Sequence, residues 1–211
     1  MQVFWPIVLT VSGLATASLF ARAVRGHFVS QKLPPAMKAL VALSYLALFA
    51  YLWALWTGEA AQWQRIIGFC LQIAAAGLFN WARTTTLANR ITAAFDTDQP
   101  AFLVTAGPYR FVRHPFYVSY IVCWAGSSLA ANSSILWTFC LVLSASYIAA
   151  ALMEEKKFKE STLAADYQSY SEKVGFFFPK VLALTLQSWS EDRPVCQENA
   201  LAQSRRREPR T

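Results

Sequence analysis

The chain has 211 residues, of which 55% are hydrophobic and 15% are charged, whereas about a quarter of the residues in an ordinary soluble domain are charged. Its formal net charge of +7 could indicate a nucleic-acid partner, but the basic residues lie between and after apolar runs and form no single basic face. We therefore expect an all-α integral membrane protein with no nucleic-acid partner. The four cysteines lack the paired spacing of metal ligands, so no metal site is expected.

Uncharged stretches mark the expected membrane spans, because a helix needs about 20 apolar residues to cross the hydrocarbon core. The first stretch, residues 3–21, is followed rather than preceded by its arginines, Arg22 and Arg25. This order favours a retained span over a cleaved signal peptide. Charge is absent again from residues 39–57 and 66–82, which are the expected second and third spans.

The longest uncharged stretch, residues 115–153, is too long for one crossing. At about 1.5 Å per residue it would reach nearly twice the thickness of the hydrocarbon core. Asn132, Ser133 and Ser134 lie near its middle and favour a turn. We therefore predict a helical hairpin of two spans, residues 116–131 and 135–153, which brings the total to about five membrane-spanning helices.

The short loops predict the orientation, because Lys and Arg are retained on the cytoplasmic side of a membrane. The loop after the first span carries Arg22, Arg25, Lys32 and Lys38 without an acidic residue, whereas the expected hairpin tip carries no charge. This alternation places the N-terminus outside the cell. The segment 83–114 and everything after residue 153 are then cytoplasmic.

A change of composition after residue 153 marks the cytoplasmic C-terminal region. A polar stretch with Tyr167 and Tyr170 at helical spacing predicts a helix that continues the last span. Residues 175–179 interrupt this helix. The apolar segment that follows, residues 181–189, is too short to cross the membrane and is expected to lie at its interface. Residues 1–189 should form one membrane domain, and residues 190–211 a disordered basic tail.

Two polar clusters stand out against the apolar background. The first, residues 107–117, ends where the fourth span begins, and the second is the pair Glu154 and Glu155 at the end of the fifth. Because the two spans form a hairpin, Arg113 and His114 should lie near the two glutamates. Simple anchoring of the helix ends would explain the arginines, but it would leave His114 and the paired acidic residues without a role.

In this order the motifs resemble those of the isoprenylcysteine carboxyl methyltransferases and their prokaryotic relatives, and more distantly those of the phospholipid methyltransferases. The resemblance covers roughly residues 79–179. It rests on Gly107-Pro108-Tyr109, Arg113-His114-Pro115-Phe116-Tyr117, Glu154-Glu155, Tyr167-Gln168-Ser169-Tyr170 and Pro179. The chain departs from the family pattern at residues 163–165, where members usually have Phe-Gly, and at Val118-Ser119, where many have Gly. These departures bear on the identity of the acceptor more than on the fold.

The resemblance implies transfer of a methyl group from S-adenosylmethionine to a lipophilic acceptor, either a small molecule or a lipidated one, that enters from the bilayer. An isoprenylcysteine-type carboxylate is one such acceptor. Membrane lipids are the expected surroundings, in the inner membrane of a bacterium. The residues carried over to the cofactor pocket are Gly107, Tyr109, Arg110, His114, Pro115, Tyr117, Glu154, Glu155, Tyr167 and Tyr170.

Arg113 and Glu155 are the candidate catalytic residues. The planar guanidinium of Arg113 can form paired hydrogen bonds with a carboxylate of the cofactor or of the acceptor. Glu155 or His114 could remove a proton from an amine acceptor if the pKa of the side chain were suited to it.

Two other functions fit parts of the pattern. A membrane reductase of the sterol or steroid type shares Arg-His-Pro and Glu-Glu-like elements but binds NADPH. A non-enzymatic membrane scaffold would leave the paired polar clusters unexplained.

The predicted topology can be tested with single cysteine labels. Labels at positions 60 and 133 should react from outside the cell, whereas labels at positions 32, 99 and 168 should react only after permeabilisation. Protection of position 133 together with exposure of position 99 would overturn the hairpin and its orientation.

Overall fold

The computed structural model describes residues 3–26, 35–87, 100 and 102–180. The expected interfacial segment, residues 181–189, lies outside the described residues. So do the expected basic tail and the label positions 32 and 99.

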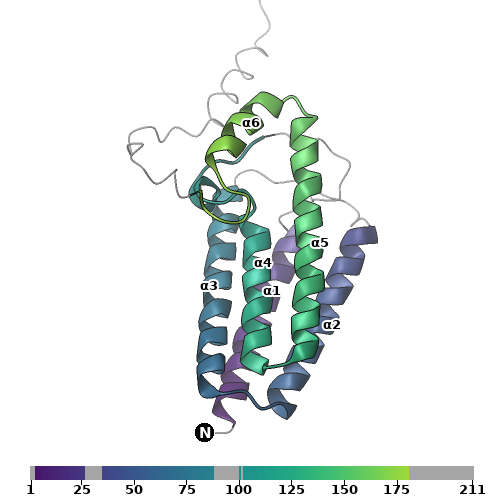
Figure 1. Ribbon diagram of the computed structural model, residues 1–211, viewed down its shortest axis with the longest axis vertical. Helices are drawn as coiled ribbons and strands as arrows, with labels where there is room; N and C mark the ends of the chain where they lie inside the picture. Colours follow the sequence, from purple (N-terminus) through teal and green to yellow (C-terminus); the bar gives the residue numbers. More distant parts are fainter. Residues whose placement is uncertain (1–2, 27–34, 88–99, 101, 181–211) are drawn as a thin grey trace, which may run out of the picture.

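Five long helices lie side by side in a bundle (Figure 1). In chain order they are α1 (Phe4–Gly26), α2 (Pro35–Thr57), α3 (Gln62–Thr86), α4 (Pro115–Ala131) and α5 (Ser134–Lys159). A short 3₁₀ helix, η1 (Gly107–Arg110), precedes α4, and α6 (Ala164–Lys173) follows α5. The described part of the chain is helical and contains no strand, which confirms the predicted fold class. Figure 1 places α6 at the end of the bundle opposite the N-terminus.

Four of the helices are long and apolar enough to cross a membrane: Phe4–Arg22 within α1, Pro35–Thr57, Gln62–Thr86 and Ser134–Lys159. The chain is therefore an integral membrane protein. The helix α4 has 17 residues, which is about the lower limit for a span, so the total of five crossings stays a prediction.

The helical hairpin turns at Asn132, as its sequence predicts. Asn132 adopts a left-handed conformation, with φ of 49°, and ends α4, a position at which Asn is tolerated better than most residues. Its side-chain oxygen accepts a hydrogen bond from Gln64 Nε2 at 3.0 Å, and its side-chain nitrogen donates to the Glu59 carbonyl at 3.2 Å. These bonds join the hairpin tip to the turn between α2 and α3.

The region after the last span differs from the expected single continuation of that helix. The helix α5 does run on to Lys159, but a turn at residues 160–163 separates it from α6. This break lets α6 lie across the end of the bundle rather than extend away from it (Figure 1).

The helices α3 and α4 pack closely because glycines face each other where they cross. A Cβ atom on Gly126 would lie 2.8 Å from Leu71 Cβ and 2.9 Å from the Gly68 carbonyl oxygen, which is closer than real Cβ atoms pack. Small residues at such crossings let two membrane helices approach each other and gain van der Waals contact. The crossing sets the position of α4, and hence of the residues at its beginning.

A hydrogen-bond network around Gln72 joins four helices in the interior. The buried amide of Gln72 accepts from Ser12 Oγ at 2.6 Å, and it donates to the Tyr51 hydroxyl at 2.8 Å and to Ser127 Oγ at 3.0 Å. Every polar group of this buried side chain has a partner, as burial in an apolar interior requires. The network therefore holds α1, α2, α3 and α4 in one register.

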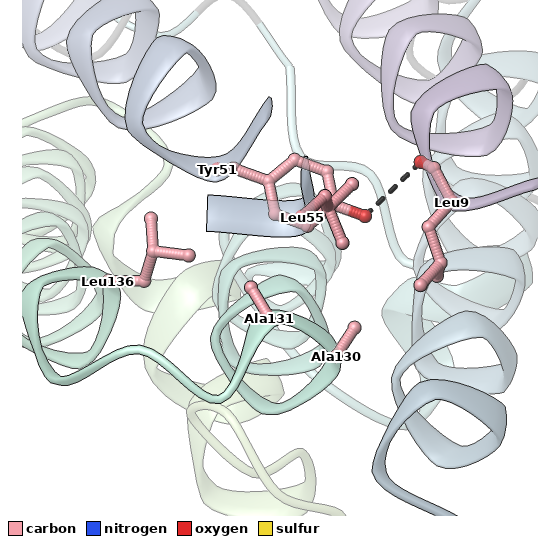
Figure 2. Packing of buried hydrophobic residues seen from close by; sticks show 6 residues of the cluster. All are labelled: Leu9, Tyr51, Leu55, Ala130, Ala131 and Leu136. Carbon is pink, nitrogen blue, oxygen red and sulfur yellow. Dashed lines mark hydrogen bonds between the residues drawn. The ribbon is translucent and has the colours of Figure 1, made fainter. Parts of the chain in front are cut away.

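An apolar cluster fills the end of the bundle far from α6. Figure 2 shows its six buried members, and the hydroxyl of one of them, Tyr51, donates to the Leu9 carbonyl at 3.2 Å. The members come from α1, α2, α4 and α5, and they are Leu9, Tyr51, Leu55, Ala130, Ala131 and Leu136.

The close crossing of α3 and α4 predicts opposite effects of the same substitution at two glycines. Gly126→Ala should destabilise the protein by about 1–3 kcal/mol, because an added methyl group overpacks the crossing. Gly77→Ala is the matched control in α3, since a Cβ there meets nothing within 4 Å, and it should be neutral or stabilise by up to about 1 kcal/mol through helix propensity. Thermal unfolding in detergent measures both, and equal stabilities of the two variants would contradict the packing argument.

Candidate active site

The candidate site lies at the end of the bundle where α4 begins and α5 ends. His114 is the residue before the first turn of α4, and Pro115 opens that helix at a position where its missing N–H is not needed. Glu154 and Glu155 lie in the last turns of α5, on the other arm of the hairpin. The hairpin therefore brings the two polar clusters of the sequence together, as predicted.

Two cationic and two anionic side chains form a charge cluster at this end. Arg113 Nη2 lies 2.9 Å from Glu155 Oε1, and His114 Nε2 lies 3.3 Å from the same oxygen. The other ring nitrogen, Nδ1 of His114, lies 3.5 Å from Glu154 Oε2. The imidazole thus bridges two adjacent glutamates. Both carboxylates face the imidazole, so both glutamates point into the site.

The members of the charge cluster differ in exposure. The side chains of His114 and Glu155 are 8% and 9% exposed, whereas that of Glu154 is 27% exposed. Charges with so little access to water are tolerated only when they are paired. Glu154 also accepts a hydrogen bond from the Tyr117 hydroxyl at 2.7 Å, which fixes its carboxylate toward the first turn of α4.

Arg113 connects the charge cluster to α6 and to the segment after it. Its Nη1 donates to the Ser171 carbonyl at 3.2 Å, and its guanidinium carbon lies 5.5 Å from the centre of the Phe176 ring. The Phe176 ring also packs edge-on against His114, with 5.0 Å between ring centres. Phe176 therefore covers both cations of the cluster, a role that its sequence position did not reveal.

The turn before α4 is held by backbone contacts. Gly107 has φ of +59°, and a Cβ at this residue would collide with the Thr85 side chain at the end of α3, so both the conformation and the space require glycine. The Arg113 N–H donates to the Gly175 carbonyl at 2.9 Å, next to an isolated parallel bridge between Val112 and Gly175. This pairing brings the segment after α6 onto the site.

The paired tyrosines of α6 face the same region. The Tyr170 hydroxyl donates to the Tyr109 carbonyl at 2.7 Å. The Tyr167 ring stacks on Phe158 of α5, with 4.8 Å between ring centres, and its buried hydroxyl makes no hydrogen bond. Arg113 Nε is likewise buried without a hydrogen-bond partner. These two buried polar atoms are the ones that a polar ligand would satisfy.

The electrostatics of the site follow from burial and from the carboxylates. Burial lowers the pKa of His114, but its hydrogen bonds to Glu154 and Glu155 and their negative charges more than offset this effect, so the net pKa of His114 is raised. Burial, and then the charge of Glu154, raises the pKa of Tyr109 well above its usual range. His114 is therefore expected to carry a positive charge and Tyr109 to remain a neutral phenol.

The structure brings together most, but not all, of the residues that the sequence singled out. The ion pairs and hydrogen bonds join Arg113, His114, Tyr117, Glu154 and Glu155, and Tyr109 and Tyr170 border them. Arg110 lies on the exposed side of η1. Gly107 and Pro115 shape the backbone rather than contribute polar groups.

Sequence reasoning missed three aromatic residues that border the site: Tyr120, Tyr147 and Phe176. Two of them follow helical spacing from residues that it did select. Tyr120 lies one turn after Tyr117 in α4, and Tyr147 lies two turns before Glu154 in α5, so each shares a helix face with a selected residue.

Two comparisons with known proteins found similar sequences. Residues 63–164, just under half of the chain, match the model of the phospholipid methyltransferase family. The chain is also similar to the methanethiol S-methyltransferase of Pseudomonas sp. (strain GM41(2012)), with 34% identity over 84 residues. That alignment covers 39% of this chain and 30% of the Pseudomonas protein, so the chain spans less than a third of that relative.

Both matches relate the chain to known methyltransferases. Residues 63–164 are thus similar to the phospholipid methyltransferase family. The matched residues contain the whole charge cluster together with the close crossing of α3 and α4.

The raised pKa of His114 can be measured directly. The chain has two histidines, His27 and His114, so a His27→Asn background leaves one imidazole whose titration NMR can follow. The midpoint should lie above the ordinary value of about 6.5, and Glu155→Gln should lower it. Because the folded-state pKa is raised, stabilisation by these ion pairs is present below about pH 6.5 and is lost as the pH rises through the raised value. A midpoint below the ordinary value would contradict the bridged geometry.

Proposed function

We propose that the protein is an S-adenosylmethionine-dependent methyltransferase of a bacterial inner membrane, with its site on the cytoplasmic side and an acceptor that enters from the bilayer. The observation that carries the proposal is the charge cluster of Arg113, His114, Glu154 and Glu155 at the edge of a membrane bundle, inside the region of the methyltransferase family match.

The residues present fit the cofactor. S-adenosylmethionine has an ammonium group and ribose hydroxyls that donate hydrogen bonds and a carboxylate that accepts them. Glu154 is the most exposed member of the charge cluster and is suited to the ammonium group, while Arg113 Nε and the Tyr167 hydroxyl are buried polar atoms without partners. The bound cofactor supplies an activated methyl group on a sulfonium, so the protein has mainly to align the two reactants and exclude water.

A thiol is the acceptor class that we favour. The relative from Pseudomonas is a methanethiol S-methyltransferase. A carboxylate acceptor, which the motif resemblance suggests, would need a cation to hold it, but the Arg113 guanidinium already binds Glu155 and the Ser171 carbonyl. Methylation of a thiol forms a bond from the methyl carbon to the acceptor sulfur, breaks the bond to the sulfonium and releases the thiol proton, for which solvent at the partly exposed edge of the charge cluster is a sufficient acceptor.

The two alternative functions, a membrane reductase and a non-enzymatic scaffold, would require different properties of the same residues. A reductase would have to bind NADPH, whose 2′-phosphate calls for arginines that are free to form paired hydrogen bonds, whereas Arg113 is held by Glu155. A scaffold would need no buried charges at all. Ligand binding therefore separates the three functions.

Cofactor affinity of purified protein in detergent tests the proposal. S-adenosylmethionine should bind, and Glu155→Gln and His114→Ala should each weaken binding about tenfold or more, which corresponds to about 1.4 kcal/mol. Glu160→Gln is the matched control, because Glu160 directly follows the end of α5, is 60% exposed and pairs with Lys156 instead. It should leave the affinity unchanged. Binding of NADPH in place of S-adenosylmethionine would refute the proposal, and so would unchanged affinity in both site variants.

A further inference from the structure

We propose that the acceptor is a compact molecule, and that Tyr120 is the residue that limits its length by closing the bundle interior directly below the site. This inference rests on the proposed methyl transfer and narrows its acceptor class. Between the small and the lipidated acceptors that the sequence left open, it selects the small one.

A wall of tyrosine rings begins directly under the charge cluster. Tyr117, whose hydroxyl binds Glu154, stacks on Tyr147 of α5 with 5.9 Å between ring centres. Tyr120 lies 5.2 Å from Tyr147 and 6.4 Å from Tyr117. One turn separates Tyr117 from Tyr120, which at about 1.5 Å per residue is a descent of about 4.5 Å along α4. The three rings therefore close the space between α4 and α5 within one turn of the site.

Phenylalanine rings continue the wall across the bundle to α1 and α3. Phe79 of α3 is fully buried, and its ring centre lies 5.0 Å from Phe116 and 5.7 Å from Tyr120. Phe20 of α1 packs on both Phe79 and Tyr120, at 4.6 Å and 4.8 Å. Tyr120 is the residue that joins the tyrosines to the phenylalanines, and four helices contribute to the wall.

Between the described rings of this wall, these spacings leave no passage for a hydrocarbon chain. Ring centres about 4.5–7 Å apart are in direct contact, whereas an alkyl chain between two rings would have to separate them by its own thickness. An acceptor whose reactive atom reaches the charge cluster can therefore extend only a few atoms toward the bundle interior. A long tail that entered this way would have to displace Tyr120.

One apolar groove among the described residues does not offer another route. It lies between α2 and α5 and has a volume of about 240 Å³. Its residue nearest in sequence to the site, Val142, is twelve positions before Glu154 on α5, which places it about 18 Å away along the helix axis. Its lining residues are Leu43, Ile135, Thr138, Phe139 and Val142. A chain in this groove would not reach the charge cluster.

Acceptor length is therefore the measurement that tests the inference. Purified protein in detergent with S-adenosylmethionine is given methanethiol or 1-decanethiol, and acetic or decanoic acid as a second pair, and methylated products are quantified. Wild type should methylate a short acceptor at least tenfold faster than its ten-carbon partner. Tyr120→Ala should reduce this ratio by tenfold or more, whereas Tyr120→Phe, which keeps the ring, should preserve it.

Two further variants keep the test decisive. Tyr45→Ala makes the same change on the exposed face of α2, where the side chain is 54% exposed, and should leave the ratio unchanged. Phe20→Ala opens the wall from α1 and should act like Tyr120→Ala if that variant does not fold. Equal rates on long and short acceptors in wild type, or no turnover of any short acceptor by protein that binds S-adenosylmethionine, would overturn the inference. Failure to bind S-adenosylmethionine would instead refute the proposed function.

Discussion

The pairing of Arg113 and His114 with Glu154 and Glu155 is the constraint on which this end of the molecule depends. A charge at the edge of a membrane bundle is costly to bury unless a partner of opposite sign lies beside it, and removing one partner leaves the other uncompensated. The ion pairs therefore close the open end of the α4–α5 hairpin. Since Arg113 also binds the Ser171 carbonyl, the same pairs fix α6 over the site.

The types of residue that fill the bundle below the charge cluster change along its length. The packing at each level helps to position the helices at the next level. Leucines and alanines around the Tyr51 ring fill the far end, Gln72 joins four helices in the interior, and aromatic rings fill the end next to the site. The glycine crossing draws α4 against α3, so the beginning of α4 has one position relative to α5. Packing remote from the charge cluster therefore contributes to the position of the site.

Much of this arrangement could be predicted from the sequence, because charge-free stretches are a strong signal in a membrane protein. The hairpin followed from an uncharged stretch twice the needed length, and it implied the meeting of His114 with the glutamates. Residues that act through tertiary packing could not be predicted. The sequence predicted only that Phe176 belongs to a segment that interrupts a helix. No neighbouring residue indicated that its ring packs on His114 and Arg113. The break between α5 and α6 was also missed, since the polar stretch had helical spacing throughout.

The orientation of the two glutamates shows why geometry was needed to assign the site. Adjacent helical residues point about 100° apart, so two neighbouring side chains do not ordinarily face the same point. The imidazole of His114 removes this restriction, because its two nitrogens reach one carboxylate each. With His114 protonated, as the raised pKa favours, the four side chains carry two positive and two negative charges. A neutral acceptor such as a thiol can approach this balanced cluster without a further counter-charge, whereas a carboxylate would have to compete with Glu155 for Arg113.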